Sequence, residues 1–398
     1  MPLFRFLMLF ASLYVAFGVA SPFLPAFLSS RGLTPEQIGT LLSAAAFIRL
    51  VSGPLAGRLA DRLHAIRGVL ALCTAAAALF ACGFLPASSF SMLLIASLLH
   101  AAMLAPTTTL ADALAVRAAA PATGERRFEY GWVRGTGSAA FIVGSLVSGQ
   151  LLNVLPLASA LVGQAALLLV AAGAALFVPA VAAAAHRRST FVKGDGSLSI
   201  LITNRPFLLL VLTAALILGS HAMHDAFAMI AWNAAGISPG LGSMLWSEQV
   251  AAEVLVFVVL GPLLLQRMRP EHAMLIAALA ATLRWLTFAA SSSVVAFAVV
   301  EPLHGITFAL FHLACMRVLV LVTPAALAAT AQAFYAVGIG ATSAAITFAS
   351  GFLYADAGRS GFLLMALLSA CSIPVIWLLV KAQRPTPHRW PKADPDQL

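Results

Sequence analysis

The chain has 398 residues, of which 61% are hydrophobic and 9% are charged, whereas charged residues make up about 25% of an average soluble domain. With a mean hydropathy of +0.98, this composition excludes a water-soluble globular protein. The net charge of +9 does not indicate a nucleic-acid partner, because nucleic-acid binding requires Lys and Arg clustered on a soluble surface.

A helix that crosses a bilayer needs about 20 apolar residues, and most of the chain divides into stretches of this kind. The first stretch is too long for a signal-peptide core, so we expect it to be retained. The pattern predicts an all-α membrane protein with the lipid bilayer as its solvent. Twelve transmembrane helices are expected, at residues 3–29, 37–58, 68–86, 90–117, 128–153, 157–183, 206–233, 241–265, 272–290, 293–320, 325–354 and 360–381.

The distribution of basic residues predicts the orientation of these helices. On this topology most of the 23 Lys and Arg residues fall at the two termini and in the loops on the same side, while Arg31 and Arg359 lie on the opposite side. Positively charged loops stay in the cytoplasm. We therefore expect a multi-pass protein of the cell inner (plasma) membrane with both termini cytoplasmic.

The two halves of the chain repeat each other at a constant offset of 204 residues. Internal repeats that flank a site at the membrane midplane are a common architecture of transporters with alternating access. The repeat predicts two pseudo-symmetric six-helix bundles. The matching positions are Gly32-Leu33-Thr34-Pro35 with Gly236-Ile237-Ser238-Pro239, Gly57 with Gly261, and His100 with His304.

The predicted domain boundaries follow from the polar segments. We expect an N-terminal bundle at residues 1–184, a cytoplasmic central loop at 185–205, a C-terminal bundle at 206–383 and a cytoplasmic tail at 384–398. The loop and the tail are rich in polar residues and are expected to be mobile and solvated.

Four titratable side chains lie in the middle of predicted spanning helices in the second half: Glu253, Arg284, Glu301 and His304. A charge at mid-bilayer costs about 2.5–3.5 kcal/mol on insertion scales, so each needs a partner, a water-filled cavity or a function. A carboxylate held near an arginine is a plausible proton relay. Ion pairs that only hold helices together are the alternative, although burying ion pairs is a poor route to stability.

Other polar residues within the helices are less specific. His221, His224 and Asp225 are close in sequence, and interhelical hydrogen bonds or a cavity lining are favoured over a metal site, because no HExxH motif accompanies them. Glu248 lies five residues from Glu253 and is expected to point elsewhere. No cofactor or metal is predicted.

Arg49 lies in the middle of the second predicted helix, at the position equivalent to Glu253 under the repeat. It either captures a substrate carboxylate or pairs with an acid on a neighbouring helix. We name five candidates for substrate binding: Arg49, His100, Trp246, Gln332 and Tyr335.

The hexamer Gly57-Arg58-Leu59-Ala60-Asp61-Arg62 follows the second predicted helix. It resembles the signature loop of the major facilitator superfamily, in which the glycine allows close helix approach and the acid interacts with neighbouring helix ends. The later Gly-Arg-Arg of that signature is missing. Gate or conformational roles are predicted for Gly57, Asp61, Arg62, Asp112, Glu129 and Arg134, the last three near the cytoplasmic ends of their helices.

Within that superfamily the chain resembles the phenylpropionate permease group, which is related to lactose-permease-like proton symporters. The similarity runs almost from end to end, and Arg49 matches. Its further markers are Gly32-Leu33-Thr34-Pro35 with Ile38-Gly39, Asp112-Ala113-Leu114-Ala115, Tyr130-Gly131 with Arg134, Gly137-Ser138, Leu245-Trp246-Ser247, Ala252-Glu253-Val254, Arg284-Trp285, Leu303-His304-Gly305 with Thr307-Phe308, His312-Leu313-Ala314, and Gly351-Phe352-Leu353-Tyr354.

The resemblance implies proton-coupled uptake of a small organic solute, with an aromatic acid such as 3-phenylpropionate as the nearest named substrate. Lactose permease also uses a carboxylate, an arginine and a His/Glu pair on its helices 8, 9 and 10, although here the pair is reversed, with Glu301 before His304. Glu248 and the segment 221–225 are not part of the pattern of the group. The expected partners are a small-molecule substrate, protons and lipid, and the protein is expected to be monomeric.

Two other functions remain open at this stage. A proton antiporter of the same fold would export its substrate, but the helix-5 region has no proline like that of drug antiporters. A membrane-embedded enzyme would need Ser138 as nucleophile and His100 as base, and no Gly-x-Ser-x-Gly motif surrounds Ser138. Uptake is favoured over both.

Overall fold

The computed structural model describes residues 2–119, 128–179, 196–324 and 327–383, and every element in these ranges is a helix. The predicted tail at 384–398 and residues 185–195 of the predicted central loop lie outside the described residues. In chain order the helices are α1 (Pro2–Ala20), α2 (Leu24–Ser30), α3 (Pro35–Arg62), α4 (Ile66–Gly83), α5 (Phe90–Ala119), α6 (Tyr130–Leu151), α7 (Ala158–Phe177), α8 (Gly196–Thr203), α9 (Arg205–Gly219), α10 (Ala222–Ala234), α11 (Pro239–Leu255), η1 (Val256–Leu260), α12 (Gly261–Arg267), α13 (Pro270–Ala290), α14 (Val294–Val300), η2 (Glu301–Leu303), η3 (Gly305–Leu310), α15 (Phe311–Val322), α16 (Ala328–Ala357), η5 (Gly358–Gly361) and α17 (Phe362–Gln383).

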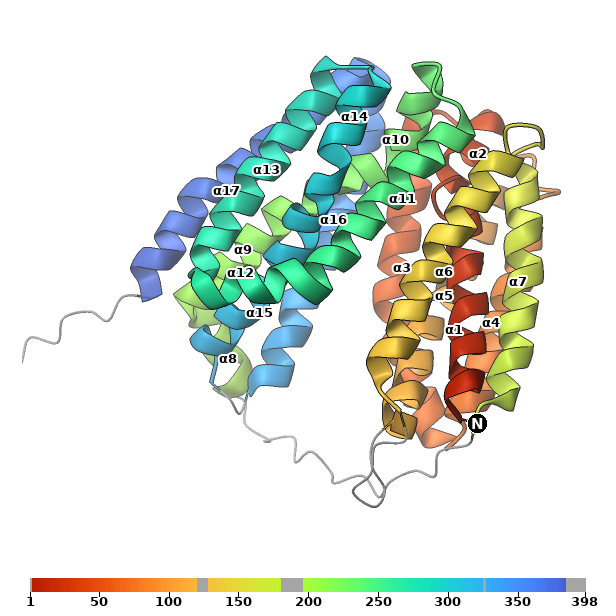
Figure 1. The fold of residues 1–398 in the computed structure, drawn as a ribbon, viewed down its shortest axis with the longest axis horizontal. Helices are drawn as coiled ribbons and strands as arrows, with labels where there is room; N and C mark the ends of the chain where they lie inside the picture. Colours follow the sequence, from red (N-terminus) through yellow and green to blue (C-terminus); the bar gives the residue numbers. More distant parts are fainter. Residues whose placement is uncertain (1, 120–127, 180–195, 325–326, 384–398) are drawn as a thin grey trace, which may run out of the picture.

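The helices form two groups side by side, α1 to α7 and α9 to α17 (Figure 1). Ten stretches of the described chain are long and apolar enough to cross a membrane. One of them, Thr330–Gln383, contains both α16 and α17, and α6 is not among the ten. The predicted number of twelve is reached when α16 and α17 are counted separately and α6, which is less apolar, is added.

One predicted loop contains a helix. Residues 196–203, which we expected to be a solvated part of the central loop, form α8. Leu201 of this helix is fully buried and packs in the same hydrophobic cluster as Phe207 of α9. Helix α8 therefore packs against α9, at the start of the second group.

Within the residues that the structure describes, four of the predicted spanning helices are interrupted. The first breaks between α1 and α2, and the seventh breaks at Ser220 and His221 between α9 and α10. The eighth and tenth contain π-helical turns at η1 and η3. Pro22, Pro262 and Pro302 lie at or beside three of these interruptions. Proline lacks the N–H that an α-helix requires, so it favours an interruption of the helix. Three of the interruptions are in the second group.

The internal repeat is visible in the backbone. Gly32 and Gly236 have φ of 81° and 80°, a left-handed conformation that favours glycine. Two residues further on, the hydroxyl oxygen of Thr34 accepts from the backbone N–H of Gln37, and that of Ser238 accepts from the N–H of Leu241. The same turn and N-cap therefore begin α3 and α11.

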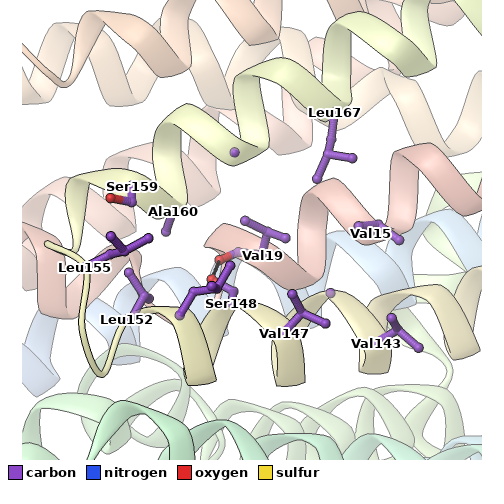
Figure 2. Close-up of a pocket in the computed structure, with 13 residues that line it drawn as sticks. Val15, Val19, Val143, Val147, Ser148, Leu152, Leu155, Ser159, Ala160 and Leu167 are labelled. Atoms are coloured by element: carbon purple, nitrogen blue, oxygen red, sulfur yellow. Dashed lines mark hydrogen bonds between the residues drawn. The ribbon is translucent and has the colours of Figure 1, made fainter.

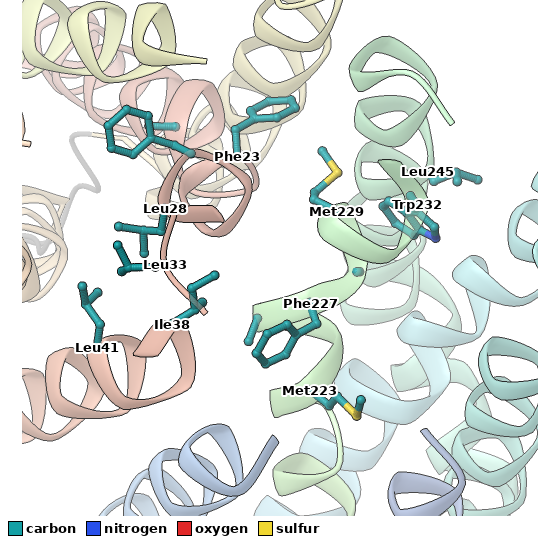
Figure 3. Packing of buried hydrophobic residues seen from close by; sticks show 14 of the residues in the cluster. Phe23, Leu28, Leu33, Ile38, Leu41, Met223, Phe227, Met229, Trp232 and Leu245 are labelled. Atoms are coloured by element: carbon teal, nitrogen blue, oxygen red, sulfur yellow. The ribbon is translucent and has the colours of Figure 1, made fainter. Parts of the chain in front are cut away.

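The two groups meet at the ends of α3, α6, α11 and α16 that lie on one side of the molecule. The α-carbons of Gly39 and Gly351 are so close that a Cβ on Gly39 would lie 2.8 Å from the Gly351 Cα. The backbone N–H of Gly240 donates to the side-chain oxygen of Asn153 (3.0 Å) across the other seam. Figure 3 shows the apolar part of this contact, where Phe23, Leu28, Leu33 and Ile38 face Met223, Phe227 and Met229.

At the opposite ends of α3 and α6, glycine residues of the first group face open space. A Cβ added at Gly53 or Gly57 of α3, or at Gly131 or Gly135 of α6, would meet no atom within 4 Å. The close helix approach expected for Gly57 is therefore absent in this conformation, because the two groups diverge there. The N-terminus lies on this open side (Figure 1).

Gly149→Val is expected to oppose closure of the contacting side, because a Cβ at this position would lie 2.1 Å from the hydroxyl oxygen of Ser243 on α11. In a background without native cysteines, we expect a single cysteine at position 153 to react several times faster with a membrane-impermeant maleimide when Gly149→Val is present. The matched control is Gly173→Val, whose Cβ would meet open space. Equal labelling in the two variants would contradict the prediction.

Candidate functional site

The interrupted helices of the second group surround an ionic cluster in the protein interior. Arg284 of α13 and Glu301 of η2 are both 0% exposed and form an ion pair. The same guanidinium donates to the side-chain oxygen of Gln249 (2.7 Å) and to Nδ1 of His304 (3.1 Å). Burial without these partners would be costly for either charge, and the pairing explains how both are accommodated.

His304 extends the cluster toward Glu253. Because Arg284 donates to His304 Nδ1, the imidazole carries its proton on Nε2 when it is neutral. Nε2 lies 3.5 Å from Oε2 of Glu253. The glutamate is 25% exposed, so the contacts run from a solvent-accessible carboxylate through His304 to the buried ion pair. The predicted convergence of two carboxylates, a guanidinium and an imidazole is present in the structure.

His224 joins the cluster from α10. Its Nε2 lies 3.0 Å from Oε1 of Glu301, and its Nδ1 lies 3.5 Å from Oδ1 of Asp225. His224 is 1% exposed, whereas Asp225 is 64% exposed. The segment 221–225 is therefore connected to the relay candidates rather than separate from them. In the described residues no group of three or more His, Cys, Asp or Glu side chains is arranged to hold a metal ion.

The remaining histidine of this segment is held by two hydrogen bonds. His221 Nδ1 donates to the backbone carbonyl of Ile217 (2.9 Å), and its Nε2 lies 3.0 Å from the hydroxyl of Thr307 in η3. These bonds tie the break between α9 and α10 to the π-helical turn. Irregular helix turns are frequent at functional sites, and here the two irregular segments support each other.

Two cavities adjoin the cluster. The Arg49 cavity, about 370 Å³, is lined by residues of both groups, among them Arg49, His100 and Gln164 on one wall and Asp225, Trp246 and Ser343 on the other. The Glu253 cavity, about 360 Å³, is lined by Glu253, His304, Gln249 and His221. Both include Asp225, Trp246 and Ser343. Their sizes fall in the range of small-molecule sites, about 300–1,000 Å³.

Arg49 is exposed to its cavity from the middle of α3. Within the described part of the chain it makes no ion pair, so no acid on helix α1, α4, α5 or α6 neutralises it here. His100 is nearly buried beside it, with Nδ1 2.9 Å from the carbonyl oxygen of Ala77. Trp246 stacks on His224 with 5.3 Å between ring centroids.

Two of the substrate-binding candidates lie elsewhere. Tyr335 is buried in a hydrophobic cluster with Cys315, and Gln332 is exposed. Neither lines the Arg49 or the Glu253 cavity. Helix α16 lines the Glu253 cavity with Ile339 and Ser343, and Tyr335 lies about one turn before Ile339 with its side chain in the hydrophobic cluster. Tyr335 and Gln332 are therefore outside the linings of these two cavities.

Another cavity, on the outside of the first group, is apolar. It lies between α1, α6 and α7 and is lined by valine and leucine side chains such as Val15, Val19 and Leu167 (Figure 2). Its polar side chains are Ser148 and Ser159, and Ser148 already donates to the carbonyl of Val19 (2.8 Å). This pocket offers no charge to a polar solute.

The gate candidates lie on the open side. Tyr130 donates its hydroxyl proton to Asp112 (2.7 Å), and the guanidinium of Arg134 lies 5.0 Å from the ring centre of Tyr14. Asp61 is 3.9 Å from Arg117, an exposed pair of the kind that contributes about 0–1 kcal/mol. Glu129 and Arg62 are exposed. These contacts join α1, α3, α5 and α6 within one group.

Sequence patterns missed Gln249, which holds Arg284, and Ser343, which lines both cavities. Gln249 lies four residues before Glu253 on the same helix. The i, i+4 spacing places the two side chains on one face, so this partner was detectable once Glu253 had been selected. No local sequence pattern identifies Ser343 as a residue of the cavities.

The comparisons with known proteins agree with this architecture. Residues 3–366 match the model of the MFS_1 like family. The chain is 32% identical over 378 residues to the probable 3-phenylpropionic acid transporter of Escherichia coli (strain K12), which covers 92% of this chain and 94% of that protein. It is 27% identical over 389 residues to the maltose permease of Geobacillus stearothermophilus, over 96% and 94% of the two chains.

A solved structure has the same fold. The crystal structure of the nucleoside transporter NupG matches with a TM-score of 0.82 at 17% identity, over 97% of this chain and 100% of that one. The family match and the relative at 32% identity extend over nearly the whole chain. The chain therefore belongs to the MFS_1-like family of major facilitator transporters, and it is a multi-pass membrane transporter rather than an enzyme.

Proposed function

We propose that this protein takes up a small organic carboxylate together with protons, with an aromatic acid such as 3-phenylpropionate as the first candidate. One observation carries the proposal: an arginine without an ion pair in the described chain faces a cavity whose opposite wall belongs to an acid network. A carboxylate on Arg49 would supply the missing counter-charge.

The lining of the Arg49 cavity suits a solute with one charged end. Besides its polar groups the cavity is lined by apolar side chains, including Leu42, Leu104 and Leu161. Small-molecule sites combine such walls with a few placed polar groups. Trp246 offers an aromatic face. The E. coli relative, described as a probable 3-phenylpropionic acid transporter, supports an aromatic acid as the first compound to test.

The relay that we propose for the protons consists of Glu253, His304, Arg284 and Glu301. These groups form one continuous set of contacts from the Glu253 cavity to the fully buried Glu301. Ionisable groups within a membrane mark proton and substrate pathways. The energy source is then the proton gradient, and the transport step needs no cofactor.

The placement in the membrane is part of the same proposal. The positive-inside rule applied to the basic loops supports cytoplasmic termini, and the inner membrane is the location that we propose. The open side seen here then faces the cytoplasm. We propose that the halves 1–184 and 206–383 rock about the central cavities as a monomer, and that Gly57, Asp61, Arg62, Asp112, Glu129 and Arg134 form the gate that closes the open side.

The test is uptake by the purified protein in liposomes, with a panel of 3-phenylpropionate, other aromatic acids, sugars and nucleosides, with and without an inward proton gradient. We expect accumulation of an aromatic acid that a protonophore collapses. If only a sugar accumulates with the gradient, the proposed substrate class is wrong and the proposed proton coupling stands. Export of preloaded solute against the same gradient would favour the antiporter of the same fold.

Arg49→Ala is expected to weaken the binding of a carboxylate substrate more than that of a neutral analogue. Only the carboxylate loses a charge-assisted hydrogen bond, worth about 1.5–3 kcal/mol. The corresponding loss of affinity is on the order of 10- to 100-fold for 3-phenylpropionate and within about twofold for its amide. Binding of both compounds to the purified variant measures this. Equal losses would make Arg49 a structural residue.

A further inference from the structure

We propose that Asp225 is the acid whose protonation allows a carboxylate to occupy the Arg49 cavity, so that one proton and one solute anion bind together. This inference rests on the proposed function and adds to the proposed relay an acid that faces the solute directly. The sequence pattern predicted only a cavity lining or interhelical hydrogen bonds for the segment that contains Asp225, and the relay described above does not use this residue.

The location of Asp225 distinguishes it from the other acids of the cluster. Its side chain is 64% exposed and lines both cavities. Glu301 is 0% exposed, is held by Arg284 and His224, and lines neither cavity. Glu253 lines only the cavity that lacks Arg49. Asp225 is therefore the carboxylate that shares a cavity with Arg49 and is open to solute and water.

Several of the elements around Asp225 contribute charged or titratable groups. On its own helix they are His224, 3.5 Å away, and His221. Helix α11 contributes Glu253 through the Glu253 cavity, and His304 adjoins it there. Helix α3 contributes Arg49 across the Arg49 cavity, with His100 of α5 beside it. Helix α16 lines the wall with the uncharged Ser343 and Thr347, and α2 with Leu24 and Pro25.

The charge of the Arg49 cavity explains the coupling. With no solute, Arg49 and Asp225 carry opposite charges, and the cavity as a whole is close to neutral. A solute carboxylate on Arg49 leaves two anions and one cation in a space of about 370 Å³, where like charges repel more strongly than in bulk water. A proton from water that binds to the Asp225 carboxylate restores the balance.

Release reverses the same steps. On the side where the pH is higher, the proton leaves Asp225 for water, the aspartate regains its negative charge, and the solute anion is repelled into the open cavity. His224 links this event to the interior, because its two ring nitrogens face Asp225 and Glu301. The charge of Asp225 thus acts on the buried ion pair through one imidazole.

The experiment measures binding of 3-phenylpropionate to the purified full-length protein as a function of pH, together with proton uptake in weakly buffered solution. For the wild type we expect about one proton bound per solute, and an apparent Kd that rises toward tenfold per pH unit above the pH at which Asp225 ionises. Asp225→Asn is expected to bind the solute with a Kd independent of pH and to take up no proton.

Two further variants act as controls. Asp225→Glu retains a titratable group and should retain the pH dependence, so that a fold defect in the amide variant is recognised. Asp356→Asn removes an exposed acid at the end of α16, outside both cavities, and should bind as the wild type does.

The outcomes separate this inference from the proposed function. If Asp225→Asn keeps the wild-type pH slope and proton uptake while the wild type accumulates the acid in liposomes, the inference is overturned and the proposed function stands. If the wild type binds no carboxylate at any pH and shows no gradient-driven uptake, both fail. Loss of the slope in Asp225→Asn with its retention in Asp225→Glu supports the inference.

Discussion

Replacing Arg284 by methionine is expected to lower the free energy of unfolding by about 3–5 kcal/mol, because it leaves the carboxylate of Glu301 buried without its cation. The guanidinium is 0% exposed and also holds Gln249 and His304, so three acceptors lose a donor at once. Thermal unfolding of the purified protein in detergent, followed by tryptophan fluorescence, measures the loss.

The double variant Arg284→Met with Glu301→Leu provides the control for this mechanism. Removing both charges avoids an unpaired buried ion, and stability should return to within about 1–2 kcal/mol of the wild type. Arg359→Met removes an exposed arginine and should change stability by about 0.5 kcal/mol or less. A double variant as unstable as Arg284→Met alone would show that packing, not charge, determines the loss.

Glu301→Gln is expected to abolish uphill accumulation while some exchange of solute across the membrane remains. The amide neither takes up a proton nor carries a negative charge, so the positive charge of Arg284 is left to oppose a proton on His224 or His304, which both contact the ion pair. Net proton movement is therefore blocked. Exchange of internal for external solute requires no net proton movement and should persist.

Two transport assays on the same liposome preparation distinguish these effects. The accumulation ratio of labelled solute under an inward proton gradient should fall from well above unity to about one, while counterflow into preloaded liposomes continues. Glu301→Asp, which keeps the charge, should retain part of the gradient-driven uptake. Unchanged accumulation in Glu301→Gln would remove Glu301 from the relay, and loss of counterflow as well would point to a fold defect, which thermal unfolding would detect.

The overall architecture could be predicted from local patterns. Apolar stretches of spanning length located the helices, and the repeat at Gly32 and Gly236 marked the equivalent turns that begin α3 and α11. The polar residues in mid-helix also stood out, because a charge in an apolar stretch is costly wherever its partner lies. Arg49 and Glu253 were recognised in this way, and both line cavities in the structure.

Irregular turns were the first feature that local patterns did not locate. The prolines at positions 22, 262 and 302 indicate interruptions within apolar stretches, but a hydropathy profile alone does not detect these interruptions. A π-helical turn adds a residue to one turn and changes the direction of every side chain after it. Because η1 follows Glu253 and η3 follows His304, residue spacing alone does not predict how the faces before and after each turn are related.

The sequence by itself determined that this is a polytopic membrane protein with two related halves and buried charges in its second half, because those features depend on residues within one helix and on the bilayer. Only the tertiary structure decided which charges meet. His224 contacts Glu301 across 77 positions of the chain, Arg284 binds Gln249, and Tyr335 lies away from the cavities. Such pairings depend on the rotation and depth of neighbouring helices, which are set by packing between helices rather than by the sequence of either one.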